Sequence, residues 1–282
     1  MKNCKLFLHY AGHCLAKASH AVKGDPKQEI AFRAMFGLIR HPEKGWILFD
    51  TGYARRFYDA TRFFPNKLYA LITRVFIREE EELKSQLFRA GIRPEDIRHI
   101  IVSHFHADHI GGLKDFPNAR FYCSESAWNQ VKRISSRLAF SKGILHHLIP
   151  EDFEKRVVFV EQAAACRQDE WLGSLYDLFD DESILVFPVP GHAAGQVGIK
   201  LQTEKNTCLL VADACWDRRA YQHLALPHPV VKLFFDSWAD YKEGILRLRK
   251  YHLAFPDHLI IPSHCYSSYE HLLSPDLSRD VV

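Results

Sequence analysis

The chain has 282 residues, and its apolar fraction of 47% and aromatic fraction of 13% are those of a globular protein with a sizeable core. Its 37 lysines and arginines against 34 aspartates and glutamates leave a formal charge of +3, which argues against nucleic acid as the partner. No apolar run approaches the roughly 18 residues of a membrane span, so no transmembrane segment is expected.

Short apolar runs of the kind that form strands recur along the chain. They occupy residues 5–11, 34–40, 45–50, 97–103, 119–124, 156–161, 183–189, 195–203, 207–213 and 258–264. Residues 38–50 predict a hairpin, because Pro-Glu-Lys-Gly separates two apolar runs. Helical periodicity covers 79–90 and 237–252, and the segments 57–77 and 124–148 are also expected to be helical.

The order of these elements predicts an α/β layered domain. Strands come early in pairs and then alternate with helices, which suits two sheets packed face to face with helices outside. No repeat or Pro/Gly/Ser-rich linker interrupts the chain, so a single domain over 1–282 is expected. Seven scattered cysteines, with no Cys-x-x-Cys pair, and no N-terminal apolar stretch of signal-peptide length favour a reducing, cytoplasmic location.

The stretch "SHFHADHIGG" at 103–112 contains three histidines and an aspartate within six positions. It follows a predicted buried strand, and side chains alternate along a strand, so His104 and His106 are expected to project to the same side. The two glycines that follow allow a sharp turn and close approach, which would carry Asp108 and His109 to a neighbouring position. Imidazole and carboxylate donors in this arrangement suit zinc or a similar divalent metal.

Three further candidate ligands stand in similar settings. His192 follows an apolar run beside a glycine, Asp213 closes "CLLVAD", and His264 closes "LIIPSH". Each lies where a predicted strand gives way to a loop, a usual place to mount a site on rigid elements. A carboxylate at the end of an apolar strand is costly to leave unpaired, so Asp213 is the natural bridge between two cations.

The ordered pattern of His-x-His-x-Asp-His, Gly-His, strand-end Asp and late Ser-His resembles the metallo-β-lactamase superfamily of hydrolases over about residues 30–265. The resemblance implies a four-layer αββα sandwich. "ILFDTG" at 47–52 is similar to the superfamily's early Asp-Thr-Gly loop, which implies that Asp50 steadies the metal ligands from behind.

By this resemblance the chain binds two divalent metal ions, with zinc expected before iron, manganese or cobalt. One ion would take His104, His106 and His192, the other would take Asp108, His109 and His264, and Asp213 would bridge them. Two cations against two aspartates and a bridging hydroxide leave about one positive charge, which suits attack of the hydroxide on a carbonyl. Either Asp108 or Asp213 would carry the proton.

Within the superfamily, "LIRHPEKGWILFDTGY" and "PGHAAGQ" are most similar to the quorum-quenching N-acyl homoserine lactonases. The expected substrate is therefore a lactone or related ester. Those lactonases carry a tyrosine three residues after the bridging aspartate, where this chain has Trp216, whose indole only donates. Tyr53, Tyr221 and Tyr266 are candidates to supply the hydroxyl, and His223 is a further candidate for the pocket lining.

The aromatic-rich segments 53–77 and 124–180 are expected to be helical insertions that cap the pocket, implying a small-molecule substrate with an apolar acyl or ring portion. Residues 57–77 equally suit the face of a homodimer or a membrane-surface helix. Three alternatives to a lactonase stay open. They are a glyoxalase II-like thioesterase using Arg55, Arg56 and Arg62, a phosphodiesterase or nuclease of the same superfamily, and a metal-binding sensor without turnover.

Overall fold

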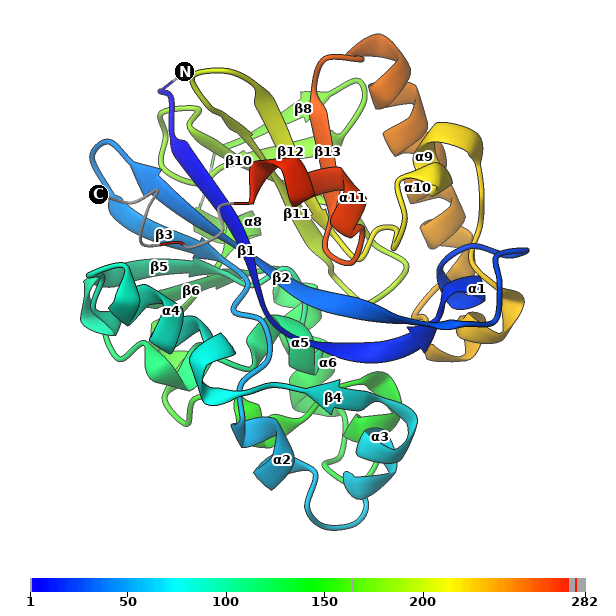
Figure 1. Cartoon of the computed structure of the whole chain (residues 1–282). Helices are drawn as coiled ribbons and strands as arrows, with labels where there is room; N and C mark the ends of the chain where they lie inside the picture. Colours follow the sequence, from blue (N-terminus) through cyan, green and yellow to red (C-terminus); the bar gives the residue numbers. More distant parts are fainter. Residues whose placement is uncertain (1, 164, 274–276, 278–282) are drawn as a thin grey trace.

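Strand β3 (Gly45–Phe49) lies in the middle of the first sheet, and its side chains alternate between two hydrophobic clusters. Ile47 and Phe49 enter one cluster and Leu48 enters the other, and all three are fully buried. A strand buried on both faces needs a layer on each side. In the computed structural model, which describes residues 2–163, 165–273 and 277, these layers are a second sheet and a set of helices (Figure 1).

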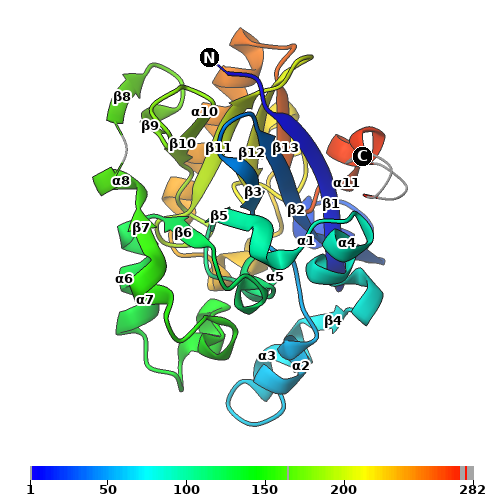
Figure 2. The ribbon, with the colours of Figure 1, turned by 90° about the vertical axis from the view of Figure 1, so that its left-hand side faces the viewer.

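The first sheet has seven strands in the order β4-β1-β2-β3-β5-β6-β7 (Figure 2). Besides β3 they are β1 (Lys5–Lys17), β2 (Glu29–His41), β4 (Arg74–Phe76), β5 (Ile97–Ile101), β6 (Arg120–Cys123) and β7 (Val157–Phe159). Strands β4, β1, β2 and β3 pair antiparallel, and β3, β5, β6 and β7 pair parallel. The predicted hairpin is confirmed, because His41 of β2 pairs with Gly45 of β3.

The second sheet has six strands in the order β13-β12-β11-β10-β9-β8. They are β8 (Ala165–Asp169), β9 (Gly173–Asp177), β10 (Ile184–Pro188), β11 (Val197–Gln202), β12 (Thr207–Ala212) and β13 (Leu259–Pro262). All neighbours pair antiparallel except β12 and β13, which are parallel. The carboxyl ends of β10, β12 and β13 therefore meet at one edge of this sheet.

The helices lie outside the two sheets (Figures 1 and 2). The α-helices are α1 (Ala18–Ala21), α2 (Arg56–Ala60), α3 (Lys67–Ile72), α4 (Leu83–Arg89), α5 (Ala107–Ile110), α6 (Glu125–Arg133), α7 (Phe153–Arg156), α8 (Val160–Ala163), α9 (Arg219–His223), α10 (Trp238–Ala254) and α11 (Tyr266–Tyr269). The 3-10 turns are η1 (Glu79–Glu81), η2 (Pro94–Asp96), η3 (Leu113–Asp115), η4 (Ala139–Lys142), η5 (His146–Leu148), η6 (Pro229–Phe234) and η7 (Glu270–Leu272).

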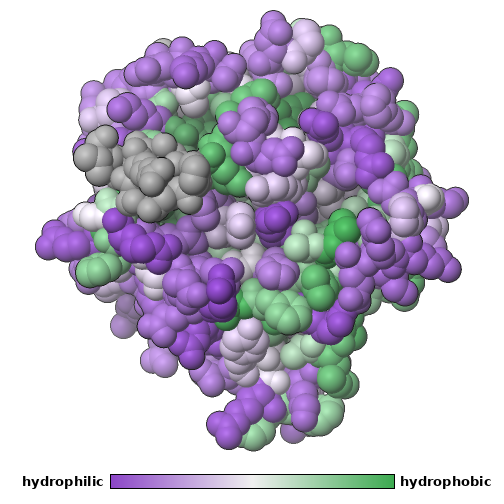
Figure 3. All heavy atoms as spheres, in the orientation of Figure 1, coloured by the Kyte–Doolittle hydropathy of each residue, from purple (hydrophilic) through white to green (hydrophobic). Residues whose placement is uncertain are grey.

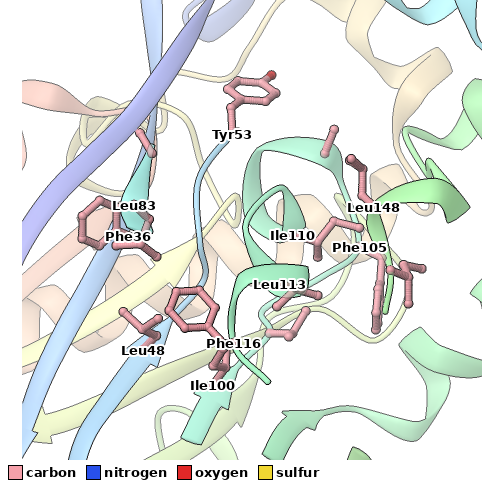
Figure 4. Packing of buried hydrophobic residues seen from close by; sticks show 14 of the residues in the cluster. Phe36, Leu48, Tyr53, Leu83, Ile100, Phe105, Ile110, Leu113, Phe116 and Leu148 are labelled. Atoms are coloured by element: carbon pink, nitrogen blue, oxygen red, sulfur yellow. The ribbon is translucent and has the colours of Figure 1, made fainter. Parts of the chain in front are cut away.

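Three large hydrophobic clusters define the layers. The first covers the outer face of the first sheet, where Figure 4 shows Phe36 and Ile100 facing the segment of Leu113 and Phe116. The second lies between the sheets, and the third packs α10 onto the outer face of the second sheet through buried side chains such as Leu248. The order helix, sheet, sheet, helix confirms the predicted αββα sandwich.

Several predicted elements differ from the observed ones. The segment 57–77 is not one helix, because α2 and α3 flank Pro65, which lacks a donor N–H, and residues 74–76 form strand β4 beside β1. The helix expected over 79–90 is broken at Glu82, whose backbone is extended and whose carboxylate accepts a hydrogen bond from the Arg55 N–H. The helix over 237–252 is confirmed as α10, with Ser237 as its N-cap.

The segment 124–180 was expected to be a helical insertion, and this prediction is wrong. It contains α6 and α7, but β7 extends the first sheet and β8 and β9 form the outer part of the second sheet. Strand β8 was missed because its side chains are mostly polar and exposed, so it lacks an apolar signal. The segment thus contributes to the sheets as well as to the surface above them.

Hydrophobic side chains are exposed around α3. Phe63 and Phe64 before this helix are 71% and 68% exposed, and Leu71 and Ile72 at its end are each 64% exposed. Figure 3 shows hydrophobic residues among hydrophilic ones in the lower part of the molecule, where α2, α3 and β4 lie. Within the described part of the chain, no helix has both the length and the apolar character needed to cross a bilayer.

Half-buried His99 on β5 makes the fold sensitive to acid. Burial, assisted by Lys44 and Arg120, lowers the pKa of His99 to about 4, and its Nδ1 lies 2.9 Å from the Tyr122 hydroxyl. The unfolded chain binds this proton near pH 6.5, so this contribution to stability is present above pH 6.5 and is lost as the pH falls toward 4.

We predict that His99→Gln flattens the decline of unfolding free energy between pH 6.5 and pH 4 by up to about one proton per molecule. Chemical denaturation at a series of pH values measures this slope, and the exposed His271→Gln serves as the matched control. An unchanged slope in His99→Gln would contradict the prediction.

Candidate metal centre

Candidate ligands from both sheets converge at the carboxyl ends of their strands. His104 and His106 follow β5, and α5 begins directly after His106 and carries Asp108 and His109. The second sheet provides three more candidate ligands: His192 follows β10, Asp213 follows β12, and His264 follows β13. A hydrogen bond from the Val197 N–H to the Ser103 carbonyl, 3.0 Å long, joins the two sheets beside them.

Gly111, in the stretch 103–112, lets two backbone segments approach closely. A Cβ on Gly111 would lie 2.6 Å from the Gly52 carbonyl oxygen and the Ala54 nitrogen, so the α5 segment packs directly against the loop after β3. The φ angle of Gly111 is −56°, an ordinary value, so lack of space and not backbone conformation requires glycine there. This contact brings the Asp50 loop behind His109.

The first donor group consists of His104, His106 and His192, whose candidate ligand atoms all lie within 4.8 Å of one another. The Nδ1 atom of His106 is 3.0 Å from Nε2 of His192. The His106 ring also makes a hydrogen bond to the Lys142 backbone. His104 Nδ1 lies 3.0 Å from the Ser103 hydroxyl, which leaves its buried Nε2 without a hydrogen-bond partner among the described residues.

The second donor group consists of Asp108, His109, Asp213 and His264. His264 Nε2 lies 3.2 Å from Oδ2 of both aspartates, and His109 Nε2 lies 3.5 Å from Asp108 Oδ2 and 3.4 Å from Asp213 Oδ1. An ion held tetrahedrally at about 2.0–2.1 Å places its ligand atoms about 3.3–3.4 Å apart. The spacing of these donors therefore fits a bound divalent cation.

Asp213 touches both groups. Its Oδ2 atom is 3.2 Å from His264 Nε2 in the second group and also 3.2 Å from His192 Nε2 in the first. Its Oδ1 atom faces His109 and has no hydrogen-bond partner among the described residues. One carboxylate shared in this way is the geometry of a bridging ligand between two metal positions.

Hydrogen bonds behind the histidines turn their Nε2 lone pairs toward the site. The His109 Nδ1–H donates to Asp50 Oδ2 at 2.7 Å, and the His264 Nδ1–H donates to the Arg33 carbonyl at 2.9 Å. Asp50 also accepts hydrogen bonds from the Ser103 N–H and hydroxyl, at 2.8 and 2.7 Å. Partners of this kind fix the tautomer and the ring orientation of a metal-binding histidine.

The site is buried, and its electrostatics separate the two groups. Burial holds the pKa of His104 well below its ordinary value and lowers the pKa of His192 to about 3, so both rings are neutral. Burial also opposes protonation of His109 and His264, but neighbouring carboxylates outweigh it and hold the pKa of each well above its ordinary value. The second group therefore attracts positive charge, which either protons or a cation can supply.

The residues proposed for the pocket lie in different surroundings. Trp216 is at the site, because its indole N–H donates to Asp213 Oδ2 at 2.9 Å. The Tyr221 hydroxyl donates to the Ile260 carbonyl inside the third cluster, and His223 is exposed at the end of α9. The structure therefore brings neither of the latter two into the donor groups.

The other two tyrosines proposed for the pocket, Tyr53 and Tyr266, contact Cys14 and Arg33 respectively. Tyr53 is 1% exposed and shares a hydrogen bond with the Cys14 thiol, whose pKa burial raises to about 11. Tyr266 packs under the Arg33 guanidinium, 3.7 Å from the ring centroid.

Cys14 and Tyr69 were not predicted as site residues, although the negative charges of Asp108 and Asp213 act on both side chains. Burial raises the pKa of Tyr69 well above its ordinary value, and the negative charges of Asp108 and Asp213 act in the same direction. Tyr69 faces inward from α3, packed against the first cluster and 5.8 Å from Phe57 between ring centroids. Only the alternation of exposed and inward residues along 67–72 could have indicated it.

A two-sheet sandwich that collects imidazole and carboxylate donors at its strand ends defines a class of metal-dependent hydrolases. The chain belongs to the metallo-beta-lactamase superfamily, whose family profile matches residues 33–264. It is a hydrolase of that superfamily.

Known proteins similar to this chain include several lactonases. The N-acyl homoserine lactonase AttM of Azorhizobium caulinodans is 28% identical over 220 residues, which are 76% of this chain and 75% of that protein. A mutant of B. thuringiensis AiiA with N-decanoyl-L-homoserine bound at the active site matches with a TM-score of 0.74 at 19% identity, covering 96% of this chain and 97% of the other. AidC, a dizinc quorum-quenching lactonase, matches with a TM-score of 0.65 at 19% identity, covering 94% and 89%.

Gly143 supports the first donor group from behind. A Cβ at this position would lie 2.5 Å from Cδ2 and 2.8 Å from Nε2 of His106. We predict that the added Cβ of Gly143→Ala displaces the His106 ring. Because a misplaced ligand binds the metal less well, Zn²⁺ binding should weaken at least about tenfold. Competition with a chelator measures this affinity.

The matched control for this prediction is Gly91→Ala. Gly91 has a φ of +72°, nearly the +71° of Gly143, but nothing lies within 4 Å of its added Cβ. Both variants should lose about 1 kcal/mol of stability from the left-handed backbone, and only Gly143→Ala should change metal affinity. Equal metal affinities in the two variants would show that His106 does not depend on this contact.

Proposed function

We propose that this protein is a dinuclear-metal hydrolase that opens a lactone or related ester, such as an N-acyl homoserine lactone. The observation that carries the proposal is the position of Asp213, with Oδ2 3.2 Å from a histidine nitrogen of each donor group. The similarity to AttM, AiiA and AidC supports the substrate class.

Seven residues would hold the two ions. His104, His106 and His192 would hold one, Asp108, His109 and His264 would hold the other, and Asp213 would be shared by both. When bound, divalent ions supply a nucleophile from water near neutral pH and polarise the carbonyl under attack. Three buried atoms have no hydrogen-bond partner among the described residues, namely His104 Nε2, His109 Nε2 and Asp213 Oδ1, and these atoms fit such ions. Zinc suits these donors, and iron, manganese and cobalt are accepted by the same set.

Asp108 is the residue better placed to move a proton. Its side chain is 10% exposed, against 3% for Asp213. Asp213 Oδ2 already accepts the Trp216 N–H and lies between two histidines, which reduces its basicity. A carboxylate at the open side of the site can hold the proton and pass it to the leaving alcohol oxygen.

Apolar side chains surround the donors and suit an acyl or ring substrate. Phe32 lies 5.2 Å from the His264 ring, and Phe235 lies 4.9 Å from the His192 ring, measured between centroids. Tyr69 approaches from α3 with its hydroxyl in the field of the carboxylates. These residues would exclude water from the reacting centre, and α3 would serve as part of the cap that the sequence analysis placed over 53–77.

Two of the three arginines expected for the thioesterase alternative already pair with carboxylates. Arg55 pairs with Glu79 at 2.8 Å, and Arg56 forms two hydrogen bonds with Asp115, at 2.5 and 3.1 Å. The carboxylates of a glutathione thioester would have to displace these partners, which costs more at the part-buried Arg56 pair than at the exposed Arg55 pair. The free thiols of all seven cysteines fit the expected cytoplasmic location.

We predict about two bound metal ions per chain and rapid opening of acyl lactones by the metal-loaded protein. Elemental analysis and a pH-indicator assay on acyl lactones, aryl esters, S-lactoylglutathione and bis-nitrophenyl phosphate test this. His106→Ala should lower lactone turnover by at least about a thousandfold, because it removes one ligand of a catalytic ion. The exposed His147→Ala should leave turnover unchanged.

Different results discriminate between parts of the proposal. Two ions with turnover of only the thioester or the phosphodiester would keep the site and overturn the lactone substrate. A protein that binds no metal after reconstitution would overturn the whole proposal.

A further inference from the structure

Trp216 occupies the position three residues after Asp213, on the loop between β12 and α9. Its indole N–H is directed at Asp213 Oδ2, with a nitrogen-to-oxygen distance of 2.9 Å. That oxygen is the atom that lies 3.2 Å from His192 Nε2 and 3.2 Å from His264 Nε2. The indole therefore contacts the carboxylate oxygen that the two donor groups share.

The Trp216 ring is itself held in place by aromatic neighbours. Phe32 and Phe235 meet it edge to face, with centroid distances of 5.7 and 5.3 Å, and each is at most 5% exposed. His192 also meets the indole edge to face, at 5.6 Å. A ring confined on three sides has few rotamers available, so its N–H direction is fixed before any ion or substrate binds.

We infer that Trp216 is a positioning residue, which holds Asp213 Oδ2 between the two donor groups and so sets how this carboxylate is shared by two metal ions. The inference rests on the proposed metal site. An indole donates one hydrogen bond and accepts none, so it does not move protons in this role. The hydrogen bond orients the carboxylate and leaves the other oxygen, Oδ1, facing His109.

A pair of variants separates the hydrogen bond from the bulk of the ring. Trp216→Phe keeps an aromatic ring against Phe32 and Phe235 but has no donor, whereas Trp216→Gln keeps an N–H donor at a similar reach and loses the ring. Trp238→Phe is the matched control. Trp238 is half-buried in the same aromatic cluster, 5.7 Å from Phe235, and within the described part of the chain it makes no hydrogen bond or ring contact with either donor group. Circular dichroism of the metal-free variants checks that each one folds.

The measurement is Zn²⁺ titration against a competing chelator, together with the absorption spectrum of the Co²⁺-loaded protein. We expect Trp216→Phe to weaken the binding of one of the two ions by about 10–100-fold and to shift the Co²⁺ bands. Trp216→Gln should retain most of the affinity, and Trp238→Phe should match the unmodified protein.

Several results would overturn the inference. Wild-type affinity in Trp216→Phe shows that the N–H is not needed, and equal losses in Trp216→Phe and Trp216→Gln assign the effect to ring packing. A similar loss in Trp238→Phe assigns it to general weakening of the aromatic cluster. An unmodified protein that binds no Zn²⁺ overturns the inference together with the metal site.

Lactone turnover is scored separately from these affinities. If the unmodified protein binds two ions and opens no lactone, the proposed substrate fails while the role of Trp216 is still decided by the Zn²⁺ titration.

Discussion

Buried negative charge is the constraint on which the rest of the site depends. Asp50, Asp108 and Asp213 are all buried, and the charged partners within ion-pair distance of them in the described chain are histidines. Ionised carboxylates taken out of water are costly unless cations or several donors compensate them. The surrounding loops satisfy this requirement by aiming imidazole nitrogens and N–H groups at the three carboxylates, and the remaining donor atoms converge where cations can bind.

The backbone is strained at two points beside these carboxylates. Asp50 has a φ of 59° and Ala212, directly before Asp213, has a φ of 47°, both in the left-handed region that non-glycine residues seldom adopt. Each residue ends or follows a buried strand, where the sheet holds the neighbouring backbone in position. Strain of this kind persists where the surrounding structure imposes it, and it commonly accompanies functional sites. Here Asp50 reaches Ser103 and His109, which follow the neighbouring strand β5, and Asp213 reaches across from the second sheet to His109.

Much of this arrangement could be predicted from sequence because it depends on local signals. The apolar runs that end at Asp50, Ser103 and Asp213 are continuous, so their strands and the loops after them could be placed by hydrophobicity alone. The order of these runs predicted two packed sheets with helices outside, and the resemblance to the superfamily implied the four αββα layers. Contacts between distant segments could not be predicted in the same way. The Arg33 carbonyl that orients His264 lies 231 positions away in the chain, and no residue type marks it.

Elements without an apolar pattern were also beyond prediction. Strand β8 is polar and exposed, and it is held by pairing with β9, with Asp169 opposite Gly173. Strand β4 was hidden in a segment with helical composition, and it exists because the long β1 offers it an edge. Tyr69 was not identified because Lys67 and Leu68 before it and Leu71 and Ile72 after it are exposed. The fold is needed to show that its ring packs against the first cluster, near the negative charges of Asp108 and Asp213. Trp216 was recognised as a departure from the lactonase pattern, but its partner Asp213 could only be found from the structure.

The convergence of strand ends from both sheets also links metal supply to the cohesion of the sandwich. One set of donors belongs to the loop after β5 and the other to loops after β10, β12 and β13, so each ion of the proposed metal site would be a noncovalent link between two halves of the chain. Such a link exists only when both halves are folded and docked, and its binding free energy is therefore added to that of folding. A cell short of metal would hold this chain in a form that is both inactive and less resistant to opening and proteolysis, so abundance and activity would fall together.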